Sequence, residues 1–187
     1  MAVCYFDSSA LVKMLLDEPG SDIARSLWNG ADLVVTSIVA YPEVRAALAM
    51  ASRLQRLTES EHTRAKVYWE RMWQSVSIVE ATRDVAETAG SLAERYQLRG
   101  FDAIHLASVS VVSPTLLIVA TWDERLSDAA TAMGYSVAPE QRTADSQQPT
   151  VDSRRAPPIR RRASSGTLSS CGEDQQSVSS GHWRPLR

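Results

Sequence analysis

The first 140 residues alternate between short apolar runs and longer segments in which apolar residues recur three and four positions apart. The short runs predict strands, because a strand buried on both faces needs no polar positions. The strands are expected at residues 3–6, 33–36, 76–79 and 116–120, with a candidate edge strand at 135–137. The longer segments have the periodicity of amphipathic helices. The helices are expected at residues 8–16, 21–30, 38–54, 58–74, 82–97, 102–112 and 123–133.

Strands that alternate with helices predict a defined architecture. Right-handed crossovers make neighbouring strands parallel and place helices on both faces of the sheet. The pattern therefore predicts a three-layer α/β/α sandwich with a mainly parallel central sheet of four to five strands. At the ends of elements, Ser8 or Ser9 is expected to cap the first helix. Gly100 is expected to close one helix just before Asp102 opens the next.

The composition changes near residue 140, after which Ser, Arg, Gln, Pro and Thr predominate and large apolar residues are sparse. Residues 1–140 carry 12 Lys and Arg against 18 Asp and Glu, a net charge of −6. Residues 141–187 carry 8 against 4, a net charge of +4. We therefore expect one globular domain over residues 1–138 and a low-complexity, basic, disordered tail over residues 139–187.

The cysteines and the N-terminal residues indicate in which cellular compartment the protein is expected. Cys4 and Cys171 fall in a predicted buried strand and in the tail, which is no framework for disulfides. Asp7 and Lys13 interrupt the N-terminus before the apolar region of a signal peptide develops. Residues 103–122 are uncharged and long enough to span a bilayer, but their proline, histidine and serines favour a buried helix and a buried strand. A cytoplasmic protein outside the membrane is expected.

Four acidic residues stand at the ends of strands or near the starts of helices. Asp7 follows the first apolar run and Asp123 follows the last strong one. Glu43 lies early in the long third helix, and Asp102 begins another. Each has a simpler explanation, because Asp caps helices and Glu favours their N-terminal dipole. An α/β fold nevertheless brings such positions together at the carboxyl edge of its sheet.

Four converging carboxylates repel one another and cannot all stay ionised unaided. A hard divalent cation such as Mg²⁺ or Mn²⁺ resolves this conflict, since it prefers oxygen ligands and keeps several waters. Such an ion lowers the pKa of bound water and offsets the charge of a phosphate ester, so the pattern favours phosphodiester hydrolysis. The sequence has no His and Cys cluster at zinc spacing and no glycine-rich phosphate loop.

The motifs around these acids resemble those of PIN-domain ribonucleases, and the chain is most similar to the VapC toxins of toxin–antitoxin modules. Three motifs carry the resemblance, together with Glu43 in the helix after the second strand: Asp7-Ser-Ser-Ala-Leu, Gly-Phe-Asp102-Ala-Ile-His-Leu-Ala and Thr121-Trp-Asp123-Glu-Arg-Leu. The resemblance covers about residues 1–138. It implies that Asp7 and Asp102 are the principal metal ligands, and that Glu43 and Asp123 complete the acidic site and orient the attacking water.

The same resemblance implies supporting residues and partners. Ser9 and Thr121 would donate hydrogen bonds to those carboxylates or to their waters. The implied cofactor is Mg²⁺, with Mn²⁺ as a substitute. The implied partners are an RNA substrate, a cognate antitoxin protein, and a second copy of the chain in a homodimer.

Other functions are compatible with parts of this pattern. A catalytically silent binding module would keep the fold, although the presence of all four acids argues against it. A phosphotransfer domain would use Asp7 as nucleophile, but such sites carry a second acid two positions later, where this chain has Ser9. A DNase would use the same acidic metal site, so the acids alone do not distinguish it from a ribonuclease.

Basic and titratable residues near the motifs are given the simpler interpretation. His105, three residues after Asp102, is expected to be packed or at the surface and is left out of the site. Arg53, Arg56, Arg64 and Arg71 are expected to form a solvated helix face and not a track for RNA phosphates. The tail is interpreted as an extension without a role, and electrostatic help in holding RNA is the alternative.

Overall fold

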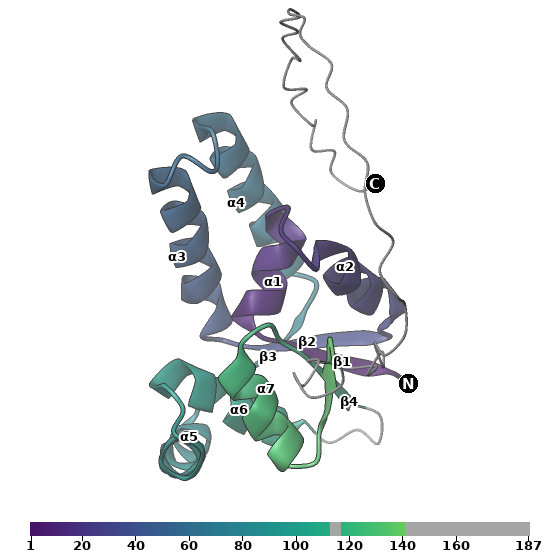
Figure 1. Ribbon diagram of the computed structural model, residues 1–187, viewed down its shortest axis with the longest axis vertical. Helices are drawn as coiled ribbons and strands as arrows, with labels where there is room; N and C mark the ends of the chain where they lie inside the picture. Colours follow the sequence, from purple (N-terminus) through teal and green to yellow (C-terminus); the bar gives the residue numbers. More distant parts are fainter. Residues whose placement is uncertain (113–116, 141–187) are drawn as a thin grey trace, which may run out of the picture. The chain divides into compact units, whose positions relative to one another are not determined.

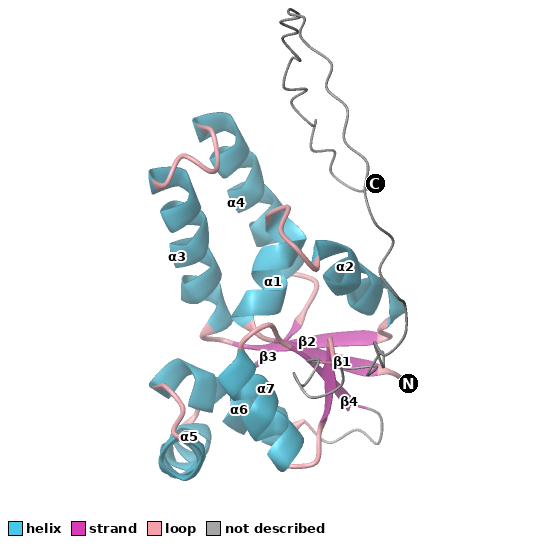
Figure 2. Cartoon of the chain, in the orientation of Figure 1, coloured by secondary structure: helices cyan, strands magenta, loops and turns pink. Residues whose placement is uncertain are grey.

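The computed structural model describes residues 1–112 and 117–140. Its five strands form one sheet in the order β3-β2-β1-β4-β5, and every pair of neighbours is parallel. Figures 1 and 2 show the sheet edge-on between two layers of helices. The strands are β1 Val3–Phe6, β2 Leu33–Ser37, β3 Ser77–Val79, β4 Leu117–Ala120 and β5 Ser136–Ala138. The predicted sandwich and its mainly parallel sheet are therefore confirmed.

Seven helices cover the two faces of the sheet in the described part of the chain. In Figure 1, α1 to α4 lie on one side of the sheet and α5 to α7 on the other. The helices are α1 Ser8–Leu15, α2 Ser21–Gly30, α3 Ala40–Arg53, α4 Glu59–Trp73, α5 Arg83–Tyr96, α6 Gly100–Val111 and α7 Glu124–Ala132. Each differs from its expected range by a few residues at most.

Strand β1 is the centre of the sheet and is buried along its whole length. Its side chains alternate between two hydrophobic cores, as the two-residue period of a strand requires. Cys4 and Phe6 pack into the core beneath α1 to α4, which also holds Trp69. Val3 and Tyr5 pack into the core beneath α5 to α7. Asp7, which directly follows β1, is therefore attached to a strand that packs into both cores.

The end of α5 differs from the prediction. Gln97, not Gly100, ends this helix in the left-handed conformation, with φ of 55°. The amide of Leu98 then donates to the carbonyl of Ala93 at 3.2 Å, and Leu98 is buried, as is typical of this helix ending. Gly100 is instead the first residue of α6, so Asp102 lies in the first turn and not at its N-cap.

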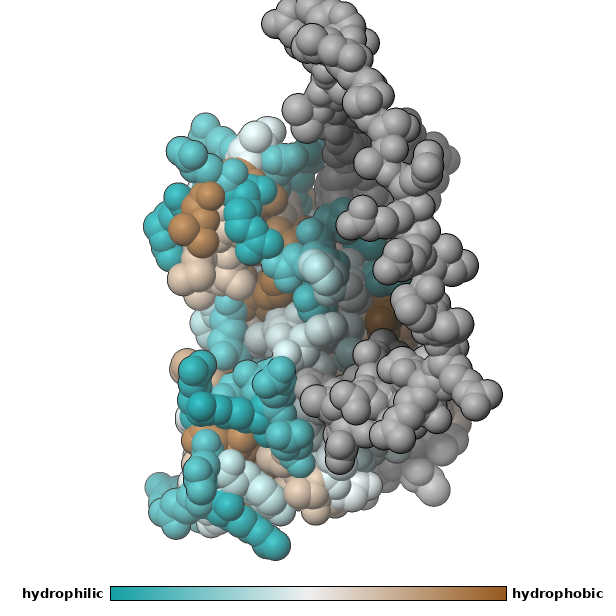
Figure 3. Space-filling model, viewed as in Figure 1, coloured by the Kyte–Doolittle hydropathy of each residue, from teal (hydrophilic) through white to brown (hydrophobic). Residues whose placement is uncertain are grey.

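Two further features are the polarity of the described surface and the uncharged stretch at residues 103–122. Figure 3 shows hydrophilic residues over much of the described surface in that view, with separate hydrophobic patches between them. Residues 103–122 contain most of α6 and the whole of β4, as expected for a buried helix and strand, although residues 113–116 lie outside the description. No helix in the described ranges is long and apolar enough to cross a membrane. The expected tail beyond residue 140 also lies outside the described residues.

Candidate active site

Asp7 connects the central strand to the first helix. Its carboxylate caps α1 by accepting from the amide of Ala10 at 2.8 Å, so the expectation that Ser8 or Ser9 caps this helix is wrong. The hydroxyl of Ser9 lies 2.7 and 2.9 Å from the two carboxylate oxygens, and Thr121 donates to Oδ2 at 2.7 Å. These three donors leave one acceptor position of the carboxylate unfilled. Burial raises the pKa of Asp7, while His105 and the hydrogen bonds oppose that shift.

The loop after β4 is attached to Asp7 through the same two hydroxyl groups. The amide of Trp122 donates to Ser9 Oγ at 2.7 Å, and the amide of Asp123 donates to Thr121 Oγ1 at 3.1 Å. Asp123 in turn caps α7 by accepting from the amide of Leu126 at 2.9 Å. The ends of β1 and β4, which are adjacent in the sheet, are thus held in one arrangement.

Glu43 lies in the first turn of α3 and points toward α1 and α6. Its Oε2 accepts a hydrogen bond from Ser8 Oγ at 2.6 Å and another from His105 Nε2 at 2.9 Å. Burial alone would raise the pKa of Glu43. The hydrogen bonds from His105 and Ser8 outweigh burial, and the pKa of Glu43 is lowered. The carboxylate is therefore ionised at neutral pH and acts as an acceptor.

His105 is the residue whose role the sequence interpretation missed. It is 2% exposed and is bonded to Glu43 through Nε2 and to the Tyr5 hydroxyl through Nδ1 at 2.8 Å. The expectation of a packed histidine holds, and the structure places this histidine beside Glu43. Its spacing of three residues from Asp102 was the available signal, because residues three apart share a helix face.

Asp102 lacks the partners that the other acids have. Its Oδ2 is buried and has no hydrogen-bond partner among the residues that the structure describes. Burial raises the pKa of Asp102 first, and the negative charges of Asp123 and Glu43 raise it further, against weaker opposition from Arg99 and His105. The charges of Asp123 and Glu43 thus act on Asp102, whereas Asp7 is joined to the backbone of Asp123 through the Thr121 hydroxyl.

The donors in this arrangement suit a divalent cation that keeps much of its water. No three His, Cys, Asp or Glu side chains within residues 1–112 and 117–140 lie close enough together to enclose a metal ion. Mg²⁺ does not require such a cage, since one or two carboxylates commonly hold it while waters fill the other positions. Asp102 has a carboxylate oxygen without a partner among the described residues, and two further acids raise its pKa, which is the electrostatic condition that a cation relieves. The residues therefore fit the ion.

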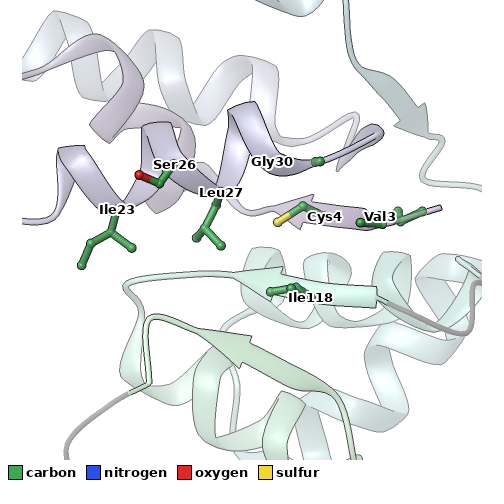
Figure 4. Close-up of a pocket in the computed structure, with 9 residues that line it drawn as sticks. Val3, Cys4, Ile23, Ser26, Leu27, Gly30 and Ile118 are labelled. Carbon is green, nitrogen blue, oxygen red and sulfur yellow. The ribbon is translucent and has the colours of Figure 1, made fainter.

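The apolar pocket in Figure 4 is a poor alternative site. It measures about 300 Å³ and is lined by carbon-rich side chains of α2, β1 and β4, including Ile23, Leu27 and Ile118. None of the four acids lines it. Cys4 is its nucleophilic group, but burial raises the pKa of that thiol to about 12, so the reactive thiolate is scarce.

Known proteins are similar to this chain in sequence. The family model of the PIN domain matches residues 4–131. Ribonuclease VapC45 of Mycobacterium tuberculosis (strain CDC 1551 / Oshkosh) is 50% identical over 141 residues, which are 75% of this chain and 98% of the relative. Ribonuclease VapC46 of Mycobacterium tuberculosis (strain ATCC 25618 / H37Rv) is 32% identical over 137 residues, which are 73% of this chain and 97% of the relative.

Solved structures give the same result for the fold. The structure of VapC20 from Mycobacterium tuberculosis, described as a toxin that cleaves the sarcin–ricin loop, has a TM-score of 0.53 at 19% identity. The structural match covers 67% of this chain and 94% of the VapC20 chain. PAE2754 from Pyrobaculum aerophilum has a TM-score of 0.52 at 16% identity and covers 68% of this chain and 84% of its own. By the family match and the identity to these relatives, the chain belongs to the PIN-domain family and, within it, to the VapC ribonucleases.

Proposed function

We propose that this protein is an endoribonuclease that hydrolyses RNA phosphodiester bonds with the help of Mg²⁺ or Mn²⁺. One observation carries the proposal: Asp102 has an unpartnered buried oxygen and is repelled by Asp123 and Glu43. A protein does not gain stability from such an arrangement, so the arrangement points to a bound cation and a charged substrate. The names of the VapC relatives supply the class of substrate.

Asp7, Glu43, Asp102 and Asp123 would hold the ion, directly or through water. The bound ion would supply the acidity that activates water and the positive charge that offsets a phosphate. Glu43, whose pKa is lowered, stays ionised and is suited to accept a hydrogen bond from the attacking water. Asp102 would supply its carboxylate oxygen to the ion. Ser9 and Thr121 keep the Asp7 carboxylate in one orientation.

Cleavage of total RNA by the full-length protein tests this function. Wild type with Mg²⁺ should produce discrete fragments, and a chelator should abolish them until Mg²⁺ is restored. Glu43→Gln should abolish cleavage, because the amide is a weaker ligand and cannot carry the charge. Persistent cleavage in the chelator, or full activity of Glu43→Gln, would contradict the proposal. Labelled DNA of the same sequence, digested in parallel, separates a ribonuclease from a DNase.

We further propose that the protein is the toxin of a toxin–antitoxin pair in the cytoplasm and acts as a homodimer. An acidic site that cleaves cellular RNA needs an inhibitor, and a basic side chain presented by a partner would complement the charges of Glu43, Asp102 and Asp123. Production of the wild type alone should stop growth of its host, and co-production of the partner encoded beside it should restore growth. Size-exclusion chromatography with light scattering tests the dimer. A harmless monomer would contradict both parts.

A further inference from the structure

Four polar side chains from four different elements form one hydrogen-bonded chain beside the acids. Tyr5 of β1 contacts His105 of α6, with 2.8 Å between the hydroxyl and Nδ1. His105 Nε2 lies 2.9 Å from Glu43 Oε2 of α3 and 3.2 Å from Ser8 Oγ of α1. The Ser8 hydroxyl donates to the same Glu43 oxygen at 2.6 Å. Tyr5 is fully buried and His105 is 2% exposed, so solvent does not replace these bonds.

The carboxylate of Glu43 fixes where the hydrogen on the His105 ring must be. An ionised carboxylate only accepts hydrogen bonds, so the Nε2 atom that faces it has to carry a hydrogen. Ser8 donates its single hydroxyl hydrogen to the same oxygen. Two donors therefore occupy Oε2, and no donor within the described residues reaches Oε1. The geometry presents Oε1 of Glu43 as the oxygen available to a cation or a water.

Tyr5 fixes the same hydrogen from the other side of the ring. A neutral imidazole carries one hydrogen, and if Nε2 holds it then Nδ1 is an acceptor. The Tyr5 hydroxyl is a suitable donor to Nδ1, because it lies 2.8 Å from that atom and a phenol carries one hydrogen to donate. The two rings meet edge to face, with centroids 6.0 Å apart and an angle of 82° between the planes. Rotation of the imidazole would break the bonds at both nitrogens.

We propose that His105 is a positioning residue of the nuclease, which holds Glu43 through Nε2–H while Tyr5 keeps the hydrogen on that nitrogen. The inference rests on the proposed function, because Glu43 is taken to contact the cation or the attacking water. His105 itself contacts neither. Groups that orient a metal-binding carboxylate commonly change metal affinity or activity by about 10- to 100-fold when removed.

The hydrogen on the His105 ring can be observed without cleavage. Long-range ¹⁵N–¹H NMR spectra of the full-length, metal-free protein should show a hydrogen on Nε2 of His105. The His105→Leu spectrum assigns the signal by its disappearance. A ring with its hydrogen on Nδ1 alone would overturn the proposal, since the lone pair of Nε2 would then face the Glu43 carboxylate.

Substitutions test the consequence for Glu43. His105→Leu removes the donor, whereas His105→Gln places an amide N–H near the position of Nε2. The leucine variant should bind Mn²⁺ about tenfold more weakly by calorimetry and should lose about 10- to 100-fold in kcat on RNA, with KM nearly unchanged. The glutamine variant should recover most of both losses. His62→Leu, on α4, is the matched control and should change neither quantity.

The outcomes separate this inference from the proposed function. If wild type binds Mn²⁺ but cleaves no RNA, the proposed function fails, and the NMR spectra and Mn²⁺ affinities still decide the role of His105. Equal Mn²⁺ affinity and kcat in His105→Leu and wild type would overturn the inference. If His105→Leu does not fold, Tyr5→Phe replaces it, because this variant keeps the ring and removes the hydroxyl. A Tyr5→Phe protein with unchanged Nε2–H signal and unchanged kcat would overturn the role of Tyr5.

Discussion

Thr121 donates a hydrogen bond to Asp7 across 114 positions of sequence, with 2.7 Å between Oγ1 and Oδ2. Thr121 is fully buried, and its oxygen also accepts from the amide of Asp123 at 3.1 Å. The Thr121 hydroxyl therefore donates to the Asp7 carboxylate, which follows β1, and accepts from the backbone amide of Asp123, which follows β4. Removing it leaves the Asp7 carboxylate one hydrogen bond short and takes away the acceptor of the Asp123 amide.

Thr121→Val should lower the free energy of unfolding by about 1–3 kcal/mol, because valine has nearly the same shape but leaves Asp7 and the Asp123 amide short of a hydrogen bond. Thr121→Ser keeps the hydroxyl and should lose clearly less. Urea denaturation of the metal-free proteins measures both values. Equal stability of the valine and serine variants would show that the hydrogen bonds do not contribute to folding.

Asp102→Asn should abolish cleavage without loss of stability. The substitution removes a charge that Asp123 and Glu43 repel, and it keeps the volume of the side chain. At neutral pH the metal-free variant should therefore melt at the same temperature as wild type or higher, while kcat on RNA falls by at least about 100-fold. Asp128→Asn, an exposed change on α7, is the control and should retain activity. Near-normal Mg²⁺-dependent cleavage by Asp102→Asn would show that the site is placed wrongly.

Gly20→Ala should destabilise the protein through contact with Trp122. Gly20 has φ of +92°, and a Cβ there would lie 2.6 Å from the indole Nε1 of Trp122. The strained backbone alone costs about 1–2 kcal/mol, and the indole must also move. Gly90→Ala is the matched control, because Gly90 lies within α5 and a Cβ there would meet no atom within 4 Å among the described residues, so alanine should stabilise by up to about 1 kcal/mol. Thermal melting of both variants should give shifts of opposite sign.

Glu18 gives a prediction about pH. It lies between α1 and α2, with Oε1 at 2.6 Å from Arg56 Nη2 and Oε2 at 3.4 Å from Lys13 Nζ. Burial alone would raise the pKa of Glu18, but the bond from Arg56 and the charge of Lys13 outweigh burial and lower it. A carboxylate with a lowered pKa stabilises the fold above its ordinary value of 4.5, and this stabilisation is lost as pH falls through the lowered pKa.

Glu18→Gln should therefore be less stable than wild type at pH 7, by about 0.5–1 kcal/mol for a partly exposed ion pair. The difference should shrink below pH 4.5 and disappear once Glu18 is protonated in the folded protein. Denaturant titrations at several pH values measure it. A difference that grows as the pH falls would contradict the assignment to Glu18.

The sequence predicted elements well because apolar periodicity reports burial directly. The strands around Tyr5 and Val119 were found in this way, and parallel topology then placed Asp7 and Asp123 at one edge. Periodicity does not say which of several adjacent polar groups caps a helix, so the sequence favours Ser8 or Ser9 where the structure has Asp7. The partners of His105 depend on how α6 is rotated against α3, which no local pattern encodes. Whether the acids hold a metal stays a prediction.

The central position of β1 has a consequence for the protein during its own synthesis. Its second neighbour in the sheet, β4, is encoded more than 100 residues later, and parallel pairings across such distances form slowly. A growing chain thus contains Asp7 and Glu43 long before Thr121 exists to hold the Asp7 carboxylate. An enzyme that attacks cellular RNA would remain harmless on the ribosome until nearly the whole domain has been made. Prematurely terminated fragments that end before β4 would remain harmless for the same reason.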